Sequence, residues 1–520
     1  MYMYSADSHI NIYLLPLWCF RGSDHTEICR SFFRRECRKY TNSFRLCCRH
    51  SIVTPKKVQN WVKLQFKMAS RMYTVFMLVG LVSVPQVIGD IGFFWHVADL
   101  HYDPNVFTDT QQKPYGDYVN DSPWSLVNSS LHAMKQIEPN ADFILWTGYC
   151  FLVYSYNQRG IITKMSRYYY YYYYYYYYYY YYYYRDTGPH RKNSVENTIS
   201  IIHDVTNLFI DVFPNTVVYA AFGNHDYSPP DQFPPHENKI YYAAANMWQR
   251  WYRDSTAKKT LLKGGYYTIS IREGLVIVVL NTNLYYTNNQ VTADMSDPAG
   301  QFQWFDQVLE QAAENGNKAY VIAHIPPGMS EVGHSILRRQ FNQRLNDLII
   351  KHKNTIAAMF YGHQHTDTFK LWYDQGEPVV FALIAPSVTP WSSHIPPIYL
   401  NQPVHNPTIR LMQYDRQSFQ VKDYWHHYLE LSDANKKGEA QWKKGYKFSE
   451  AYGTEEVSSI SLAHVVSNFD KRTDVFMKYL RYNINSAKGE TIKTSCDAKC
   501  KRRYICSIKE VDAERFKKCI

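Results

Sequence analysis

The chain has 520 residues, of which 46% are hydrophobic, and a formal net charge of +11, so it is long enough to bury one large core or two to three domains. The positive charge lies in two atypical segments: residues 1–67 hold 12 Lys or Arg against 4 Asp or Glu, and residues 149–185 hold 4 against none. The rest of the chain has a net charge of −1, which gives no support for a nucleic-acid partner.

Residues 1–67 are followed by a segment with the layout of a signal peptide. They are rich in Arg and contain five cysteines whose spacing matches no zinc-binding pattern. We interpret them as an atypical extension outside the mature protein. In residues 68–89, which open at Met68, a basic Arg71 precedes an apolar run and small or apolar residues up to Gly89. This order is typical of a secretory signal, and the run is too short for a typical transmembrane span.

From Gly92 onward, short apolar runs alternate with amphipathic helical segments, which predicts an α/β fold. We expect strands at residues 93–98, 143–147, 216–222, 275–280, 320–323 and 356–361. We expect helices at residues 123–137, 194–213 and 301–315. Polar residues of metal-binding type follow five of the strands, at the carboxyl ends where sites of open α/β sheets lie.

The first of these strand ends carries Asp99 and His101, directly after the run FWHVA. Because side chains alternate along a strand, residues two apart are expected to point to the same side. An Asp oxygen with a His nitrogen suits Zn, Mn or Fe. A single pair of this kind recurs by chance, so the later strand ends decide whether it is a metal site.

The second strand end is interrupted. The run FILWTG ends at Gly148, and 37 residues (149–185), including 17 consecutive tyrosines (168–184), separate it from DTGPH (186–190). A tyrosine homopolymer either buries phenols without partners or exposes an aggregating surface. We interpret the segment as an unspliced intron or a gene-model error. The alternative is a genuine surface loop, although structureless loops longer than about 15 residues are uncommon.

The remaining strand ends supply an amide and more imidazoles, in FGNHDY, VIAHIPPG and YGHQHTD. Taken singly, His324 is typical of a buried core histidine and Asn224 of a turn. Taken together, the strand ends supply a set that chance does not readily produce. The seven candidate metal ligands are Asp99, His101, Asp186, Asn224, His324, His363 and His365.

The motifs D-x-H, G-D, G-N-H-D, H and G-H-x-H, in this order, resemble those of the calcineurin-like metallophosphoesterases. Within them the chain is most similar to the acid sphingomyelinase-like phosphodiesterases. The stretches that carry the resemblance include FWHVADLHYDP, DSPWSLVNSS, DTGPH, YAAFGNHDY, VVLNTNLYYT, TADMSDPAGQFQW, YGHQHTD and NPTIRLMQYDR. They cover about residues 93–148 and 186–519. The resemblance implies an α/β fold, a four-layer αββα sandwich with a small, disulfide-bonded helical C-terminal region.

The resemblance also implies a site with two Zn²⁺ ions, for which other divalent metals are alternatives. Asp99, His101 and His365 would hold one ion, Asn224, His324 and His363 the other, and Asp186 would bridge both. Two such ions can share a hydroxide as nucleophile and clamp the phosphoryl oxygens. His190 and His225 are then left as the catalytic residues that stabilise the developing charge and protonate the leaving oxygen.

The expected function is that of a secreted phosphodiesterase acting on phosphodiester or pyrophosphate bonds. The substrates implied by the resemblance are nucleotides, nucleotide-linked cholines and sphingomyelin-type lipids. We expect a small-molecule or lipid-headgroup substrate, peripheral contact with a membrane, no nucleic-acid partner and a monomeric chain. The alternative is a catalytically impaired member that binds a lipid surface or a receptor, which the insert before Asp186 favours. Tyr285 and Tyr286 are read as core aromatics, with a substrate groove as the alternative.

The C-terminal part of the chain contains four cysteines, which allow three pairings, with a zinc knuckle as a further alternative. The resemblance favours the pairs Cys496–Cys500 and Cys506–Cys519. It also suggests a phosphoesterase domain over residues 90–440, interrupted at 149–185, and a helical subdomain over residues 441–520.

The predicted compartment is extracellular or lysosomal, since the cysteines and the signal-like segment both favour an oxidising environment. Asn120 and Asn128 begin N-x-S sequons, which are acceptors for N-glycosylation in a secreted chain. The chain reaches Ile520 without the hydrophobic tail that directs attachment of a lipid anchor. We therefore expect a soluble protein.

Overall fold

The structure is a computed structural model of the chain. It describes residues 90–104, 113–118, 120–148, 194–331, 333–390, 405–485 and 496–520. Contacts divide the chain after Val87, and all of these residues lie in the second unit. The predicted extension (1–67), the signal segment (68–89) and the insert (149–185) fall outside the described residues. Within the described ranges, no helix combines the length and apolar character needed to cross a membrane.

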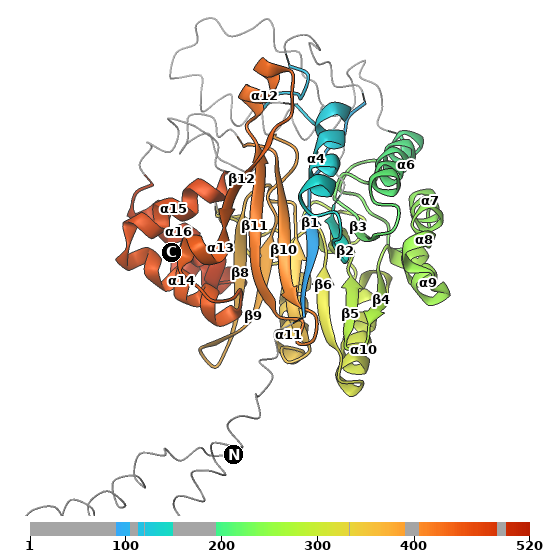
Figure 1. Cartoon of the computed structure of the whole chain (residues 1–520). Coiled ribbons are helices and arrows are strands. Elements are labelled where there is room, and N and C mark those ends of the chain that lie inside the picture. The colour runs from blue at the N-terminus through green and yellow to red at the C-terminus, as the bar shows by residue number, and fades with distance from the viewer. Residues whose placement is uncertain are drawn as a thin grey trace, which may run out of the picture. The chain divides into compact units, whose positions relative to one another are not determined.

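Two six-stranded sheets form the centre of the second unit (Figure 1). The first sheet has the order β12-β11-β10-β1-β2-β3, and the second has the order β4-β5-β6-β7-β9-β8. The first contains β1 (Ile91–Val97), β2 (Phe143–Thr147), β3 (Val217–Ala221), β10 (Thr408–Asp415), β11 (Val421–Leu429) and β12 (Trp442–Lys447). The second contains β4 (Tyr267–Arg272), β5 (Leu275–Val279), β6 (Lys318–Ile322), β7 (Ile356–Tyr361), β8 (Thr368–Asp374) and β9 (Glu377–Ile384).

The parallel strands of both sheets end at a common edge. Strands β1, β2 and β3 are parallel in the first sheet, and β5, β6, β7 and β9 are parallel in the second. The two sheets are joined at their carboxyl ends, where Ala98 forms an isolated bridge with Ser387 and Thr389 N donates to Asp99 O at 3.0 Å. The loops that follow the parallel strands therefore meet along one edge, which we call the site edge.

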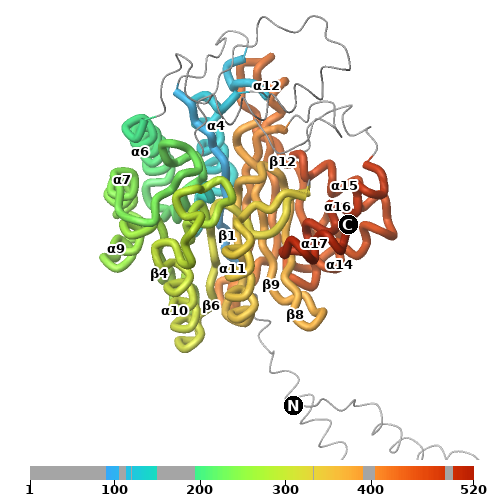
Figure 2. Tube along the Cα trace, turned by 180° about the vertical axis from the view of Figure 1, so that it is seen from behind, coloured from blue at the N-terminus to red at the C-terminus, as the bar shows by residue number. Residues whose placement is uncertain are grey.

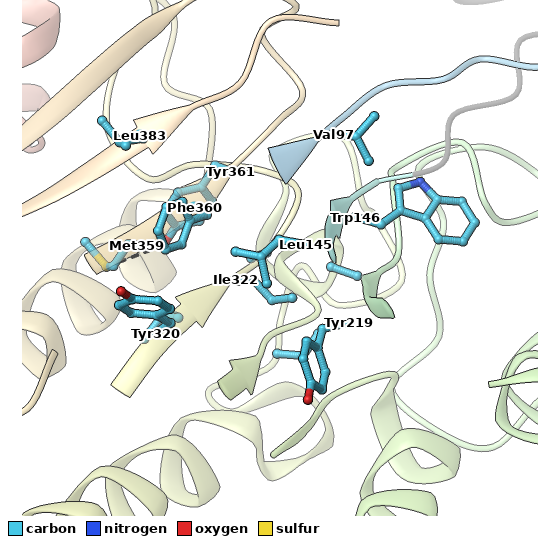
Figure 3. Close-up of a cluster of buried hydrophobic side chains, with 14 of the residues drawn as sticks. Val97, Leu145, Trp146, Tyr219, Tyr320, Ile322, Met359, Phe360, Tyr361 and Leu383 are labelled. Atoms are coloured by element: carbon cyan, nitrogen blue, oxygen red, sulfur yellow. Dashed lines mark hydrogen bonds between the residues drawn. The ribbon is translucent and has the colours of Figure 1, made fainter. Parts of the chain in front are cut away.

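The main core fills the space between the two sheets. Phe94 of β1 faces the second sheet, with its ring 5.9 Å from Tyr320 and 5.5 Å from Phe360. Trp95, the next residue, points to the opposite face and donates to Glu138 O at 3.4 Å, as the two-residue period of a strand requires. Figure 3 shows part of this core, including Tyr320, Ile322 and Phe360. Apolar burial of this kind is the dominant stabilising contribution to a fold of this size.

Helices cover the outer faces of both sheets (Figures 1 and 2). Near the first sheet lie α4 (Trp124–Ile137) and α6 (Val195–Val212), and Phe209 of α6 packs on Trp146 of β2 at 4.8 Å. Over the second sheet lie α10 (Gln301–Glu314) and α11 (Arg339–Lys351). The helices α7 (Lys239–Met247), α8 (Gln249–Tyr252) and α9 (Ser255–Gly264) lie beside β3 and β4. This layering confirms the predicted αββα sandwich.

The C-terminal helices pack at the side of the second sheet, where α14 contacts β8 and β9 and α16 contacts β8. This group comprises α14 (Ser459–Lys471), α15 (Thr473–Asn483), α16 (Ala498–Lys509) and α17 (Ala513–Cys519). Two shorter helices lie elsewhere: α13 (Phe448–Tyr452) contacts β11 and β12 of the first sheet, and α12 (Leu431–Lys437) bonds to Tyr115 and Tyr118. Disulfides join Cys496 to Cys500 and Cys506 to Cys519, which confirms the favoured pairing over the alternatives. The proposed boundary between residues 440 and 441 remains a prediction.

The predicted strands are present, with small differences at their ends. Strands β2 and β7 coincide with the predicted runs, and β6 begins two residues earlier, at Lys318. The sequence did not predict β4 or β8 to β12. The buried strand β11, with sequence VKDYWHHYL, explains why: its His, Asp and Lys residues hide the apolar pattern on which strand prediction relies.

Candidate metal centre

Six of the seven candidate ligands meet at the site edge. Asp99 and His101 follow β1, Asn224 follows β3, His324 follows β6, and His363 and His365 follow β7. Each is at most 4% exposed. The seventh candidate, Asp186, and the candidate catalytic His190 lie outside the described residues.

Asp99, His101 and His365 form what we call the first ligand group. One potential ligand atom from each lies within 4.8 Å of those of the other two. Asp99 Oδ1 is 3.4 Å from His365 Nε2 and 3.9 Å from His101 Nε2. A carboxylate oxygen with two imidazole nitrogens is a donor set that suits zinc and other divalent transition metals. The residues therefore fit a metal ion on chemical grounds.

Asn224, His324 and His363 form the second ligand group. Asn224 Oδ1 lies 2.9 Å from His324 Nε2 and 3.1 Å from His363 Nδ1. His324 Nε2 is also 3.8 Å from Asp99 Oδ1. The two groups thus adjoin, with the Asp99 carboxylate next to both. Donor atoms of three residues converge here as well, which suits a second divalent ion.

The loops after β1 and β7 have an unusual backbone. Asp99 (φ +51°), His101 (φ +47°), His363 (φ +69°) and His365 (φ +58°) all adopt the left-handed conformation. This conformation costs on the order of 1–3 kcal/mol for a residue other than glycine and is found mainly at functional sites.

This backbone corrects the predicted reason for the pairing of Asp99 with His101. The sequence pattern placed both at the end of a strand and relied on the alternation of strand side chains. That reason is wrong, because β1 ends at Val97. The two side chains come together through two left-handed residues in the loop that follows.

Two glycines allow the loops to approach closely. A Cβ atom on Gly362 would lie 2.6 Å from Thr147 O and 2.7 Å from Asp99 Oδ2. A Cβ atom on Gly148 (φ +104°) would lie 1.9 Å from His324 Nδ1. Neither position has room for a side chain, so glycine is required where β2 and β7 meet the ligands.

Buried oxygen atoms orient the ligands from behind. Asp121 Oδ1 lies 2.9 Å from His101 Nδ1, and Thr147 O lies 3.0 Å from His324 Nδ1. When Nδ1 of each ring donates to its oxygen, Nε2 is left as an acceptor facing the site, the arrangement in which metal-binding histidines are held. Asp231 Oδ1 accepts from Asn224 Nδ2 at 2.8 Å, which turns the amide oxygen toward the histidines.

Asp121 and Asp231 are the functional candidates that sequence reasoning missed. Both carboxylates are buried, with 7% of each residue exposed. Asp121 opens the DSPW stretch that carries part of the resemblance, and this was the one available signal. No spacing rule links it to His101, which lies 20 residues earlier.

The surroundings favour the metal-binding protonation states of Asp99 and His324. At His101, burial would lower the pKa, but Asp121 and Asp99 raise it. Burial alone would raise the pKa of the Asp99 carboxyl, but the nearby His365, His324 and His101 hold that pKa well below its usual value. Burial lowers the pKa of His324. An ionised Asp and a neutral His are the protonation states in which these side chains act as ligands.

His225 and Tyr286 lie next to the two groups without belonging to either. The ring of His225 is 6.0 Å from that of His101, and the side chain is half-buried. The ring of Tyr286 is edge-on to His363 at 5.2 Å. Tyr285 is buried and stacks on Phe302 at 4.2 Å. Core packing therefore describes Tyr285, whereas Tyr286 lies at the site.

Comparisons with known proteins cover both halves of the described unit. Residues 94–367 match the calcineurin-like phosphoesterase family, and residues 377–520 match the acid sphingomyelin phosphodiesterase C-terminal region. The chain is 36% identical over 453 residues to acid sphingomyelinase-like phosphodiesterase 3b of Homo sapiens, covering 82% of this chain and 90% of that protein. It is 34% identical over 454 residues to the cyclic GMP-AMP phosphodiesterase SMPDL3A of Homo sapiens, covering 83% and 90%. It is 28% identical over 491 residues to sphingomyelinase phosphodiesterase C of Dictyostelium discoideum, covering 88% and 99%.

Proposed function

Because the chain belongs to the acid sphingomyelinase-like phosphodiesterases within the calcineurin-like phosphoesterases, we propose that its site edge hydrolyses phosphodiester or pyrophosphate bonds with two divalent metal ions. One observation carries the proposal. Two adjoining groups of buried N and O donors converge at the ends of parallel strands, and the Asp99 carboxylate lies beside both. We take zinc as the metal, since imidazole and carboxylate ligands suit it.

The residues have distinct parts in the proposed site. The first ligand group would hold one ion and the second group the other, while Asp186 enters as the shared ligand from the sequence alone. Two divalent ions bound there would supply a nucleophile at neutral pH and neutralise charge on the phosphoryl oxygens. Asp121 would keep His101 in the tautomer whose Nε2 faces the site, and Asp231 would keep the Asn224 oxygen aimed inward.

His225 is the described residue best placed for proton transfer. Its half-buried ring lies near His101 and outside both ligand groups. A histidine in this position can donate a proton to the leaving oxygen or a hydrogen bond to the phosphoryl group. His190, four residues after Asp186, is proposed to share this work on the basis of the sequence alone.

The proposed substrates are small phosphodiesters: nucleotides, nucleotide-linked cholines and sphingomyelin-type lipids. The names of the similar proteins support this range, since they include a cyclic GMP-AMP phosphodiesterase and a sphingomyelinase phosphodiesterase. We further propose that the chain is secreted or lysosomal and monomeric, with peripheral membrane contact. The two disulfides support an oxidising compartment.

Hydrolysis of bis(p-nitrophenyl) phosphate by the purified protein tests the proposal. We expect turnover that a chelator abolishes and added Zn²⁺ restores, and slower turnover of the monoester p-nitrophenyl phosphate. Turnover unaffected by the chelator would contradict the metal-dependent reaction. Bound metal without any diester turnover would favour the impaired, binding-only alternative.

A separate experiment compares the protein with and without the insert. We propose that residues 149–185 are absent from the working enzyme, since 17 consecutive tyrosines favour aggregation. Deleting them is expected to raise both the soluble yield and the diesterase activity. Equal yield and equal turnover with and without the insert would identify it as a tolerated loop, for which loop-closure entropy sets only a small cost.

A further inference from the structure

We propose that the C-terminal region helps the metal centre to retain its metal. In this proposal Asn483 and Asn485 are positioning residues for the loop that carries His363 and His365. This inference rests on the proposed function. It assigns to the end of α15 a role in metal retention, rather than only in packing against the second sheet.

The backbone of the ligand loop is held from α15. The loop runs from Gly362 to Asp367, between β7 and β8. Asp367 N donates to Asn483 O at 3.1 Å, and Asn483 Nδ2 donates to Asp367 O at 3.1 Å. This reciprocal pair satisfies both backbone groups of Asp367, at a position where Asp367 is 5% and Asn483 2% exposed. Asn485 Nδ2 lies 3.5 Å from His365 O.

The side chain at the end of the loop is held from the first sheet. Arg410 of β10, which is fully buried, donates from Nη2 to Asp367 Oδ1 at 2.7 Å and to Ile384 O at 2.9 Å. The Tyr446 hydroxyl of β12 donates to the other Asp367 oxygen. The loop is thus fixed at Asp367 by three elements that follow β9 in the sequence.

The ligand loop needs this support because its backbone is strained. His363 and His365 both have positive φ angles, and such residues keep their conformation only where the surroundings determine it. Asn483 and Arg410 provide that restraint without contacting either ligand group. Groups that support a metal ligand from behind typically change metal affinity by about 10- to 100-fold when removed.

A second set of contacts joins the same regions away from the ligands and provides a matched control. Asn346 of α11 donates from Nδ2 to Val511 O at 3.0 Å and accepts from Trp372 Nε1 at 2.9 Å. Like Asn483, it is a buried amide that links the phosphoesterase region to the C-terminal region. Its loss should therefore lower stability without reaching the loop of His363 and His365.

The test compares the full chain with its Asn483→Ala and Asn346→Ala variants, each loaded with Zn²⁺. Release of Zn²⁺ to a colorimetric chelator and the thermal unfolding temperature are measured for all three. Asn483→Ala is expected to release Zn²⁺ faster than wild type, by up to the factor of about 10 to 100 that loss of a ligand's direct partner causes in metal affinity. Asn346→Ala is expected to unfold at a lower temperature while releasing Zn²⁺ at the wild-type rate.

The variant Asn485→Gly keeps the test decisive should Asn483→Ala fail to fold. Asn485 has a φ of +58°, which glycine adopts without strain, so this change removes the amide and preserves the backbone. Faster Zn²⁺ release than wild type supports the proposal. Wild-type release rates in every folded variant at positions 483 and 485 would overturn it while leaving the proposed function intact. A wild-type protein that binds no Zn²⁺ would overturn both.

Discussion

The two ligand groups are held in place by different means. In the first, Asp99, His101 and His365 all have left-handed backbone conformations. In the second, only His363 is left-handed, with a φ of +69°. Asn224 and His324 have ordinary φ angles, and hydrogen bonds to Asp231 and to Thr147 O orient them. All three ligands of the first group therefore depend on an unusual backbone, whereas two of the three in the second group depend on the partners of their side chains. Substitutions should affect these two halves of the centre differently.

The largest expected effect is the loss of a ligand, which would break either half. His365→Ala removes an imidazole from the first group, and we expect diesterase turnover to fall at least about a thousandfold, since the metal contributes several kcal/mol. Metal content should fall as well. His352→Ala is a suitable control, because His352 is also buried and lies 2.6 Å from a carboxylate, that of Asp306, away from the site. Full activity and full metal content in His365→Ala would remove this residue from the centre.

The next effect concerns His225, which lies next to the two ligand groups and belongs to neither. His225→Ala is expected to lower phosphodiester turnover by about 100-fold, the range for a proton donor or charge stabiliser. Metal content should stay at the wild-type level, because His225 belongs to neither ligand group. Elemental analysis of the variant checks this. A lost metal ion would make His225 a ligand, and the comparison would have to be redrawn.

A smaller effect should differ between the two ligand groups and so distinguishes them directly. Asp121→Ala removes the partner of His101, and Asp231→Ala removes the partner of Asn224. Both should weaken Zn²⁺ binding within the range of about 10- to 100-fold. We expect the larger loss for Asp231→Ala, because Asn224 has no special backbone conformation to keep it in place. Metal affinities by chelator competition test this, and the opposite ranking would contradict the distinction between the halves.

The smallest effect concerns stability alone, at Lys370, which belongs to neither ligand group. Burial lowers the pKa of Lys370 to about 8, and its Nζ donates to Met329 O at 2.8 Å and to Ser507 O at 3.0 Å. Between this pKa and the unfolded value of about 10.4 the unfolded chain binds the extra proton, so the free energy of unfolding should rise with pH. Lys370→Met should flatten that rise relative to wild type and leave turnover unchanged. If the free energy of unfolding, measured with denaturant, changed with pH in parallel for the two proteins, this prediction would be wrong.

The sequence was most informative where apolar strands end in polar residues. Asp99, Asn224, His324 and His363 could be predicted to converge because parallel strands end at one edge, and the structure brings them together. The resemblance then divided them into two groups. The residues that hold the ligands could not be found in this way.

The missed features depend on contacts between distant parts of the chain. Asn483 meets Asp367 across 116 residues, and no local pattern predicts such a contact. The left-handed conformations of His101 and His365 could not be predicted either, because only a small share of histidines adopt them and the surrounding fold imposes them. Strand β10, which carries Arg410, escaped prediction because its buried charge interrupts the apolar pattern.

The central claim is that the strand-end residues form a two-metal centre, and metal content tests it most directly. Residues 90–520 without the insert at 149–185 would be purified in the absence of chelators and examined by elemental analysis. The account predicts two divalent transition-metal ions per chain, with a lower content when His365 or His324 is replaced by Ala. A protein that carries no metal, and binds none when Zn²⁺ is added, would contradict it.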